Sequence, residues 1–294
     1  MSNFDDLLTN APTEELSIPQ LTKEEYAAKK QAEREELFTL SDETALDVTT
    51  DGGKFQALLD LQARLDRYSA VNSLLVFAQN PQASRLGDFD FWKEKNCSVR
   101  PGQTAIGILE PQAYTKEDGS PGTGYNVKKV FDISQVDTRR LNFPPLPSHT
   151  ERQILNALIK RAPMNISGAD NLPDGLGAMI TPEGDIFVRK GMGFDDTFRA
   201  IVYEMAGYEL ATDPELSDTQ AFCAYSAAYL LCKKYGVDTQ AFHFEKVDSV
   251  FIGMDAQEIK GELSQIRDAA EDISLRMARQ FEAQQKAAKS QESR

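Results

Sequence analysis

The chain has 294 residues, 41% of them hydrophobic, so it is long enough to bury one large core or two smaller ones. Its 46 acidic and 32 basic residues give a net charge of -14, which excludes general nucleic-acid binding by bulk electrostatics and leaves only a local patch for any DNA contact. The three scattered cysteines exclude a disulfide framework, and no segment has the composition of a signal peptide or a transmembrane helix, so the sequence predicts a cytoplasmic protein with reduced thiols and no membrane partner.

The first half of the chain is predicted to be a leader followed by a folded block. Residues 1–45 are acidic and poor in apolar side chains, which is typical of a partly disordered leader, although residues 22–38 also fit a solvated helix. The block 46–141 has the apolar spacing of an α+β unit. Its predicted elements, in chain order, are helices at 53–65 and 69–78, a strand at 104–110, a Gly/Pro/charged loop at 116–124 and a strand at 125–133.

Three prolines interrupt residues 142–150, which are therefore predicted to form a linker. The block 151–294 is predicted to be mostly helical with a small β-sheet, so the whole chain is an α+β protein. Its predicted elements are a helix at 151–162, strands at 178–181 and 186–189, and helices at 196–210, 218–235 and 255–288. The last of these has one apolar stripe, which favours packing on its own domain, with a coiled coil or a partner helix as the alternative.

The sequence offers few groups for catalysis. The two histidines, His149 and His243, lie far apart and neither has the helical spacing of a metal ligand pair, so a tight zinc site is not expected. The nucleophile elbow, the phosphate-binding loop and the dinucleotide fingerprint are all absent from the sequence. No cofactor is predicted.

The segment 197–210 follows a predicted hairpin, and its register resembles the active helix of zincin metallopeptidases. The resemblance implies that Tyr203 and Gly207 stand where such a helix carries its two histidine ligands, and that Glu204 stands at the position of the general base. Tyr225 then stands where the following helix of such relatives supplies an acidic ligand. All three ligand positions are thus degenerate, and neither a bound metal nor peptidase activity is expected. The alternative is that both tyrosines are core aromatics and the pattern is accidental.

The N-terminal block carries a second resemblance, in five motifs. These are Tyr68–Leu75 (YSAVNSLL), Ala78–Ala83 (AQNPQA), Phe91–Lys93 (FWK), Val99–Ile106 (VRPGQTAI) and Ile108–Pro111 (ILEP). Their order is similar to that of the N-terminal domain of ArdC-like antirestriction proteins, which is also found in LtrC-like proteins of conjugative elements. That family joins a single-stranded-DNA-binding domain to a zincin-like metallopeptidase domain. The resemblance covers about residues 50–285.

The resemblance implies a single-stranded-DNA-binding site in the first block, where residues 61–140 carry a net charge of +2. Aromatic rings would stack on bases, cations would pair with phosphates, and amides on one helix face would reach sugar or base edges. The candidates are Tyr68, Ser69, Asn72, Gln79, Trp92, Lys93, Arg100, Lys128 and Lys129, with Lys95, Tyr125, Arg139 and Arg140 as further possibilities. The structural alternatives are core packing for the aromatics, a solvated face for the cations, and a brace between helix and strand for Asn72 and Gln79.

Three functions remain open at this level. The leading hypothesis is a mobile-element accessory protein that binds single-stranded DNA or counters host defence, with a pseudo-metallopeptidase domain. The second is an acidic inhibitor that mimics DNA and occupies a host defence protein, in which case the leader should matter. The third is an active metallopeptidase with unusual ligands. The sequence leaves the oligomeric state open.

Overall fold

The computed structural model describes residues 22–116, 118–139, 141, 143, 148–213 and 215–292. Within these residues the protein has an α+β fold, in which long helices carry small sheets, as predicted. No helix in these ranges is long and apolar enough to cross a membrane. All three cysteines are free and buried, as the sequence predicts.

The first helix, α1 (Lys23–Val48), occupies most of the segment predicted to be a leader. It starts at Thr22, whose hydroxyl accepts a hydrogen bond from the Glu25 backbone N–H while the Glu25 carboxylate accepts one from the Thr22 N–H. Its C-terminal half buries Leu37, Ala45 and Val48. A leader through residue 45 is therefore too long, because these sparse apolar side chains find cover on other elements. Residues 1–21 lie outside the described residues.

The next two helices match the predicted positions closely. α2 (Gly52–Arg64) begins after Asp51, whose carboxylate accepts a hydrogen bond from the Lys54 N–H. α3 (Ala70–Gln79) begins after Ser69, whose hydroxyl accepts one from the Asn72 N–H. Each cap satisfies a backbone donor that the first helical turn leaves unpaired, so the helix starts are specified locally.

The sheet of the first half is built around a long hairpin. Its strands are β1 (Leu86–Gly87), β3 (Ile106–Thr115) and β4 (Pro121–Asp132), in the order β1-β4-β3. The hairpin is longer than predicted, because β3 continues to Thr115 and residues 121–124 of the expected loop belong to β4, whose Gly122 and Gly124 pair with Tyr114 and Gln112. A small annex holds α4 (Phe89–Glu94), β2 (Ser98–Val99), η2 (Ile133–Gln135) and β5 (Val136–Asp137).

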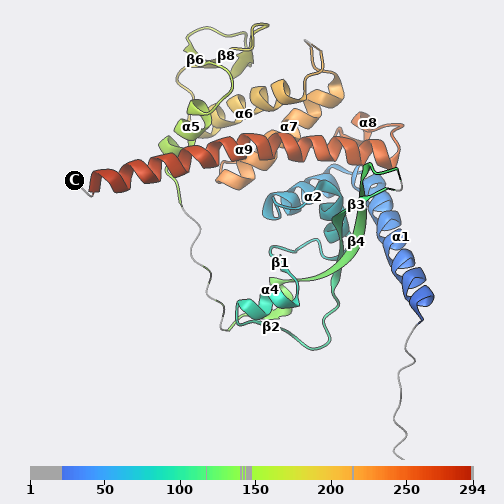
Figure 1. Ribbon diagram of the computed structural model, residues 1–294. Coiled ribbons are helices and arrows are strands. Elements are labelled where there is room, and N and C mark those ends of the chain that lie inside the picture. Colours follow the sequence, from blue (N-terminus) through green and yellow to red (C-terminus); the bar gives the residue numbers. More distant parts are fainter. Residues whose placement is uncertain are drawn as a thin grey trace, which may run out of the picture.

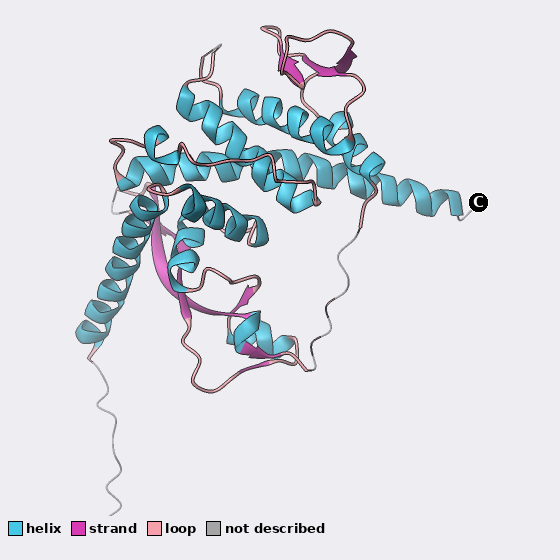
Figure 2. Ribbon diagram, turned by 180° about the vertical axis from the view of Figure 1, so that it is seen from behind, coloured by secondary structure: helices cyan, strands magenta, loops and turns pink. Residues whose placement is uncertain are grey.

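The second half is a helical layer with a three-stranded sheet at one edge (Figure 2). The sheet has the order β6-β8-β7, in which β6 runs parallel to β8 and β7 antiparallel to it. Its elements are α5 (Glu151–Lys160), β6 (Ile166–Ala169), β7 (Ala178–Ile180), β8 (Ile186–Arg189), α6 (Phe194–Leu210), α7 (Asp218–Tyr235), α8 (Val247–Val250) and α9 (Ala256–Glu292). Strand β6 was missed by the sequence interpretation, because its four residues show no clear alternation.

Helix α9 lies between the two halves of the molecule, as Figure 1 shows. It contacts α1 and α3 on one side and α5, α6 and α7 on the other. Its predicted apolar stripe is buried along its whole length: Ile259, Leu263, Ile266, Ala270, Ile273 and Met277. The stripe therefore packs on the protein's own core, which confirms the favoured interpretation over a coiled coil.

The two halves share one hydrophobic core. Phe55 of α2 and Leu74 of α3 belong to the same buried cluster as Phe198, Tyr229 and Ile273 of the second half. The predicted division at 142–150 therefore does not separate two cores, and residues 142 and 144–147 of the predicted linker lie outside the described residues. Three smaller clusters lie around the hairpin and the annex, and Thr150 at the end of the predicted linker caps α5.

Candidate functional site

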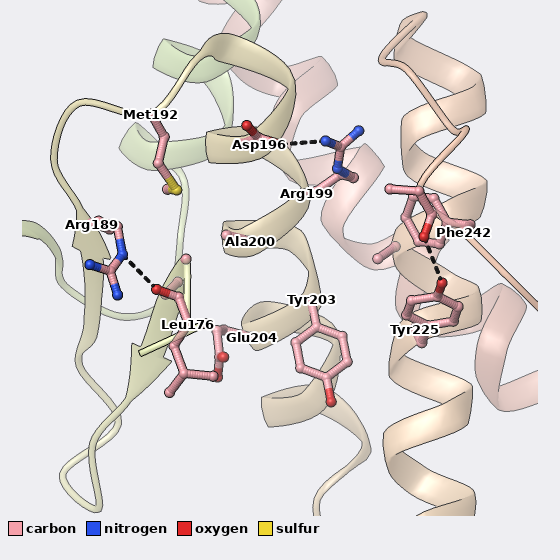
Figure 3. Close-up of a pocket in the computed structure, with 15 residues that line it drawn as sticks. Leu176, Arg189, Met192, Asp196, Arg199, Ala200, Tyr203, Glu204, Tyr225 and Phe242 are labelled. Atoms are coloured by element: carbon pink, nitrogen blue, oxygen red, sulfur yellow. Dashed lines mark hydrogen bonds and ion pairs between the residues drawn. The ribbon is translucent and has the colours of Figure 1, made fainter. Parts of the chain in front are cut away.

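A pocket of about 530 Å³ opens where the β7–β8 hairpin faces α6 and α7 (Figure 3). It contains three of the four residues for which the sequence analysis expects a degenerate zincin site, namely Tyr203, Glu204 and Tyr225. Its volume is in the range of ordinary small-molecule sites. Residues 175–178 and Arg189 come from the strand side, and Phe242 closes the side behind α7.

Glu204 lies on the side of α6 that faces the strands (Figure 3). Its Oε2 accepts a hydrogen bond of 3.2 Å from the Ile180 N–H, which belongs to the edge strand β7. Among the described residues no cation lies within ion-pair distance of this carboxylate. Burial raises the pKa of Glu204 above its ordinary value, and the single backbone hydrogen bond only partly opposes that rise. The pocket thus holds one half-buried carboxylate without a counter-charge.

Tyr203 and Tyr225 face each other from neighbouring helices (Figure 3). Tyr225 is held by the loop behind α7, because its hydroxyl donates to the Ala241 carbonyl at 3.2 Å and accepts from the His243 N–H at 2.8 Å. Burial raises the pKa of both phenols, and the Glu204 carboxylate raises that of Tyr203 further. Both side chains are therefore neutral donors at physiological pH.

Gly207 lies one turn after Tyr203 and is fully buried in α6. A Cβ at this position would lie 3.1 Å from Leu216 Cδ1, which is tighter than ordinary packing. Leu216 therefore fills the space that a side chain at position 207 would need. Gly207 does not line the pocket and has no side chain that could serve as a ligand.

The donor set of this pocket does not fit a zinc ion. Zinc sites in proteins use imidazole, thiolate and carboxylate donors in threes and fours. Here Glu204 and two neutral phenols share the pocket, and the second carboxylate of the lining, Asp196, is paired with Arg199. Within the ranges that the structure describes, no group of three or more His, Cys, Asp or Glu side chains is placed to hold a metal.

A second hollow of about 800 Å³ adjoins the first and shares Tyr203 and Tyr225 with it. It extends along α7 to Asp218 and across to Val250 of α8. The exposed His243 and Glu245 also line it. The two tyrosines thus form the wall between a hollow on the strand side and a hollow on the α8 side. Neither His243 nor His149 enters the first pocket; the His149 ring stacks on Phe281 of α9 at 3.7 Å.

In the first half, three residues that were predicted to contact DNA have structural roles. Asn72 exchanges two hydrogen bonds of 2.9 Å with the backbone of Leu109, and Gln79 does the same with Gly107 at 2.9 and 2.8 Å. Both amides thus pair with the free edge of β3 as a neighbouring strand would. The Ser69 hydroxyl caps α3. The structure thus shows the brace between helix and strand that the sequence left as the alternative for Asn72 and Gln79, and DNA contact by these three residues stays a prediction.

Trp92 is also unavailable to DNA. Its side chain is 0% exposed, and its indole N–H donates a 3.0 Å hydrogen bond to the Phe131 carbonyl. It packs with Cys97 and Val136 in the core of the annex. The alternative of core packing is therefore the one that the structure shows.

Lys128 and Lys129 point to opposite faces of the hairpin, because successive side chains of a strand alternate. Lys128 lies between Glu110 at 3.1 Å and Asp88 at 3.2 Å, so its charge is compensated. It lines a groove of about 330 Å³ together with the half-buried ring of Tyr68. Lys129 is exposed on the face that packs on α1, where Phe38 meets the Tyr125 ring edge-on. The structure thus brings Tyr68 and Lys128 together and separates Lys129 from them.

The remaining cations lie on or next to the annex and do not line the groove. Lys93 is exposed on α4, Lys95 is exposed directly after it, and Arg100 donates a hydrogen bond to the Ser134 carbonyl. Arg139 is paired with Asp137. Arg140 lies outside the described residues. No single basic surface therefore collects these predicted phosphate contacts in the part of the chain that the structure describes.

Comparisons with known proteins were made for the whole chain. No family model and no curated protein matches it. Among solved structures it is similar to the antirestriction protein ArdC from the R388 plasmid. The metal-free structure has a TM-score of 0.49 and 16% identity, and the match covers 72% of this chain and 86% of that one. For the Mn(II)-bound structure the values are 0.49, 15%, 72% and 85%.

Tyr114, near the tip of the hairpin, was missed by the sequence interpretation. Its ring lies over Gly122, where a Cβ would come within 2.6 Å of the Tyr114 Cζ, and it borders Gly124. The side chain is 52% exposed. The two glycines at alternate positions of β4 were a signal that sequence reasoning could have used. A strand that carries no side chains on one face leaves room there for an aromatic ring from the paired strand.

Proposed function

We propose that this protein binds single-stranded DNA along one face of the β3–β4 hairpin and that its α6–α7 pocket does not hydrolyse peptides. The observation that carries the first part is the exposed Tyr114 ring. It stands on the same hairpin face as the hydrogen-bonded pair Gln112 and Asn126, and as Lys128. Exposed aromatics with flanking polar groups are how proteins hold unpaired bases without reading a duplex.

The dimensions of this face suit an extended strand of nucleic acid. Positions 108 to 114 of β3 span about 20 Å at the usual rise of a strand. One end of this path is the Tyr114 ring, and the other is the groove that holds Tyr68. Between them the amides of Gln112 and Asn126 offer donors and acceptors to sugar or base edges. A few nucleotides fit along this path.

The charges of this face predict that stacking contributes more to affinity than phosphate pairing. Lys128 is already paired with Asp88 and Glu110, so it releases few counter-ions when DNA binds. The salt dependence of binding should therefore be shallow compared with that of a protein that neutralises many phosphates. In this respect the proposal differs from the sequence-based expectation of a cationic site.

The motif order of the first half supports a role in a mobile element. Resemblance to ArdC-like antirestriction proteins in that region motivates the proposal that the protein counters host defence by covering unpaired DNA. The donor chemistry of the second half supports the proposal of a pseudo-peptidase, because a zinc-bound water needs ligands that Tyr203, Gly207 and Tyr225 do not supply.

Fluorescence anisotropy with labelled single- and double-stranded oligonucleotides tests the DNA proposal. We expect micromolar or tighter binding that prefers the single strand, and a Tyr114→Ala variant that binds about tenfold more weakly, since one stacked base is worth about 1–3 kcal/mol. Tyr208→Ala is the matched control, because Tyr208 is 51% exposed but lies on α6. Equal binding by both variants would refute the assigned face.

The pseudo-peptidase proposal has its own test. Purified protein is loaded with zinc, washed by gel filtration and measured by elemental analysis. We expect far less than one equivalent of zinc and no cleavage of an unfolded protein substrate such as casein. Stoichiometric zinc that is lost in a Glu204→Ala variant would contradict the proposal.

A further inference from the structure

The groups around the Glu204 carboxylate compensate its charge only in part. In the pocket of about 530 Å³ its carboxylate has one backbone hydrogen-bond donor, the Ile180 N–H, and no ion-pair partner among the described residues. A half-buried carboxylate in this state carries a desolvation penalty that the single hydrogen bond offsets only in part. A cation that enters the pocket would remove that penalty.

The other charged groups that line the pocket are already engaged. Arg199 pairs with Asp196 and donates a 2.7 Å hydrogen bond to the Asp238 carbonyl. Arg189 donates to carbonyls of the preceding loop, at 2.9 Å to Leu176 and 2.9 Å to Pro173. Among the described charged residues that line the pocket, Glu204 is therefore the one whose charge is compensated neither by an ion pair nor by a hydrogen bond to a backbone carbonyl.

The rest of the lining is mostly apolar. Leu176, Met192, Ala200 and Phe242 contribute apolar surface to the pocket, and the neutral phenol of Tyr203 lines it from the α7 side of α6 (Figure 3). Such walls accept a hydrocarbon stem or a ring, while one polar group fixes the orientation of the bound molecule. The pocket thus fits a molecule with an apolar body and a single positive head.

We propose that the α6–α7 pocket binds a primary amine carried on an apolar stem, with the ammonium group against Glu204. The amine is either a free arylalkylamine or the end of a lysine side chain. This site is independent of the DNA-binding face, and it rests on the part of the proposed function that leaves the pocket free of zinc. Binding is therefore measured in the presence of a chelator, so that a metal-dependent result would count against the proposed function and not against this site.

Isothermal titration calorimetry of the full chain with three matched probes tests the proposal. The probes are 4-phenylbutylamine, the neutral 4-phenylbutan-1-ol and the anionic 4-phenylbutyrate. We expect the amine to bind at least tenfold more tightly than the alcohol, a difference of about 1.4 kcal/mol, and the anion to bind most weakly. Equal affinity for amine and alcohol, or the tightest binding by the anion, would overturn the proposal.

Variants of the protein show which side chain causes the preference for the amine over the alcohol. Glu204→Gln keeps the size of the side chain and an acceptor for Ile180, and it should abolish the preference for the amine. Glu183→Gln, on the exposed turn between β7 and β8, is the matched control and should retain it. Ala200→Leu narrows the pocket without changing its charge and should weaken binding of amine and alcohol alike. A preference for the amine that persists in Glu204→Gln would exclude this carboxylate.

A fourth probe identifies the source of the amine. N-acetyl-lysine methylamide presents the same ammonium group on a peptide side chain. Binding of this compound that depends on Glu204 would support a lysine of a partner as the ligand. Binding of 4-phenylbutylamine alone would support a free arylalkylamine, and binding of neither would refute the site.

Discussion

The side-chain amide of Asn72 forms two 2.9 Å hydrogen bonds with the backbone of Leu109, donating to its carbonyl and accepting from its N–H. Asn72 lies on α3, and Leu109 lies on the edge strand β3. Gln79 repeats the arrangement at Gly107, two residues along the same strand. Helix α3 thus closes the free edge of the sheet with side chains, which protects an edge that could otherwise pair with another chain.

Removing one of these amides should destabilise the protein. Asn72→Ala leaves a backbone donor and an acceptor of Leu109 unpaired, and we expect a loss of about 1–3 kcal/mol in the free energy of unfolding, measured by urea denaturation. Asn72→Asp should also destabilise, because an ionised carboxylate cannot donate to the Leu109 carbonyl. Asn126→Ala is the control, since its amide is exposed on the hairpin. Tolerance of Asn72→Asp would show that only the size of the side chain matters.

Substitutions of two leucines of α1 can distinguish a helix that packs on the hairpin from a solvated leader. Leu37 is 7% exposed and contacts Leu75 and Leu109, whereas Leu46 on the same helix is 46% exposed. We expect Leu37→Ala to lower the free energy of unfolding by about 2–5 kcal/mol. Leu46→Ala should change it by less than about 0.5 kcal/mol. Equal, small effects would show that α1 does not pack on the hairpin in solution.

Trp92 is the sole tryptophan of the chain, so its fluorescence reports on one site. Because the indole is fully buried and hydrogen-bonded to Phe131, its emission should be blue-shifted and poorly quenched by acrylamide. Saturating amounts of a single-stranded oligonucleotide should leave the emission unchanged. Strong quenching by the oligonucleotide would mean that the annex opens and that the indole stacks on a base.

The carboxylate of Glu204 should make stability depend on pH in a defined direction. Burial raises the pKa of Glu204 above 4.5 in the folded protein, so its neutral form is favoured by folding. That contribution is complete below the unfolded pKa and is lost as the pH rises through the folded pKa. Glu204→Gln removes the penalty of the ionised form. The variant should therefore melt at a higher temperature than the wild type at about pH 7 and at the same temperature at about pH 3.5.

Scanning calorimetry at the two pH values checks this difference. All other carboxylates are common to both proteins, so their titration cancels in the comparison. Glu183→Gln on the exposed β7–β8 turn serves as the control and should show no difference at either pH. A variant that melts lower than the wild type at about pH 7 would show that ionised Glu204 stabilises the fold.

Much of the secondary structure was predictable because it is specified locally. Ser69 before α3 and Thr150 before α5 are capping residues that mark helix starts, and the alternation at 186–189 marks β8. Side chains alternate along a strand, which places Lys128 and Lys129 on opposite faces. The sequence alone could therefore have predicted that these two lysines do not share a surface. The leader was misjudged because α1 has no continuous apolar stripe and becomes amphipathic only near Leu37.

The candidate sites depended more strongly on the tertiary structure. The sequence by itself determined the residue types at positions 203, 204, 207 and 225, and hence that the set lacks the donors of a zinc site. Only the tertiary structure decided that Glu204 has no counter-charge among the described residues, that the amide of Asn72 is used by β3, and that the Trp92 ring is buried. The physical reason is that periodicity specifies which side chains share a face, whereas the partner of that face is chosen by packing between segments far apart in the chain.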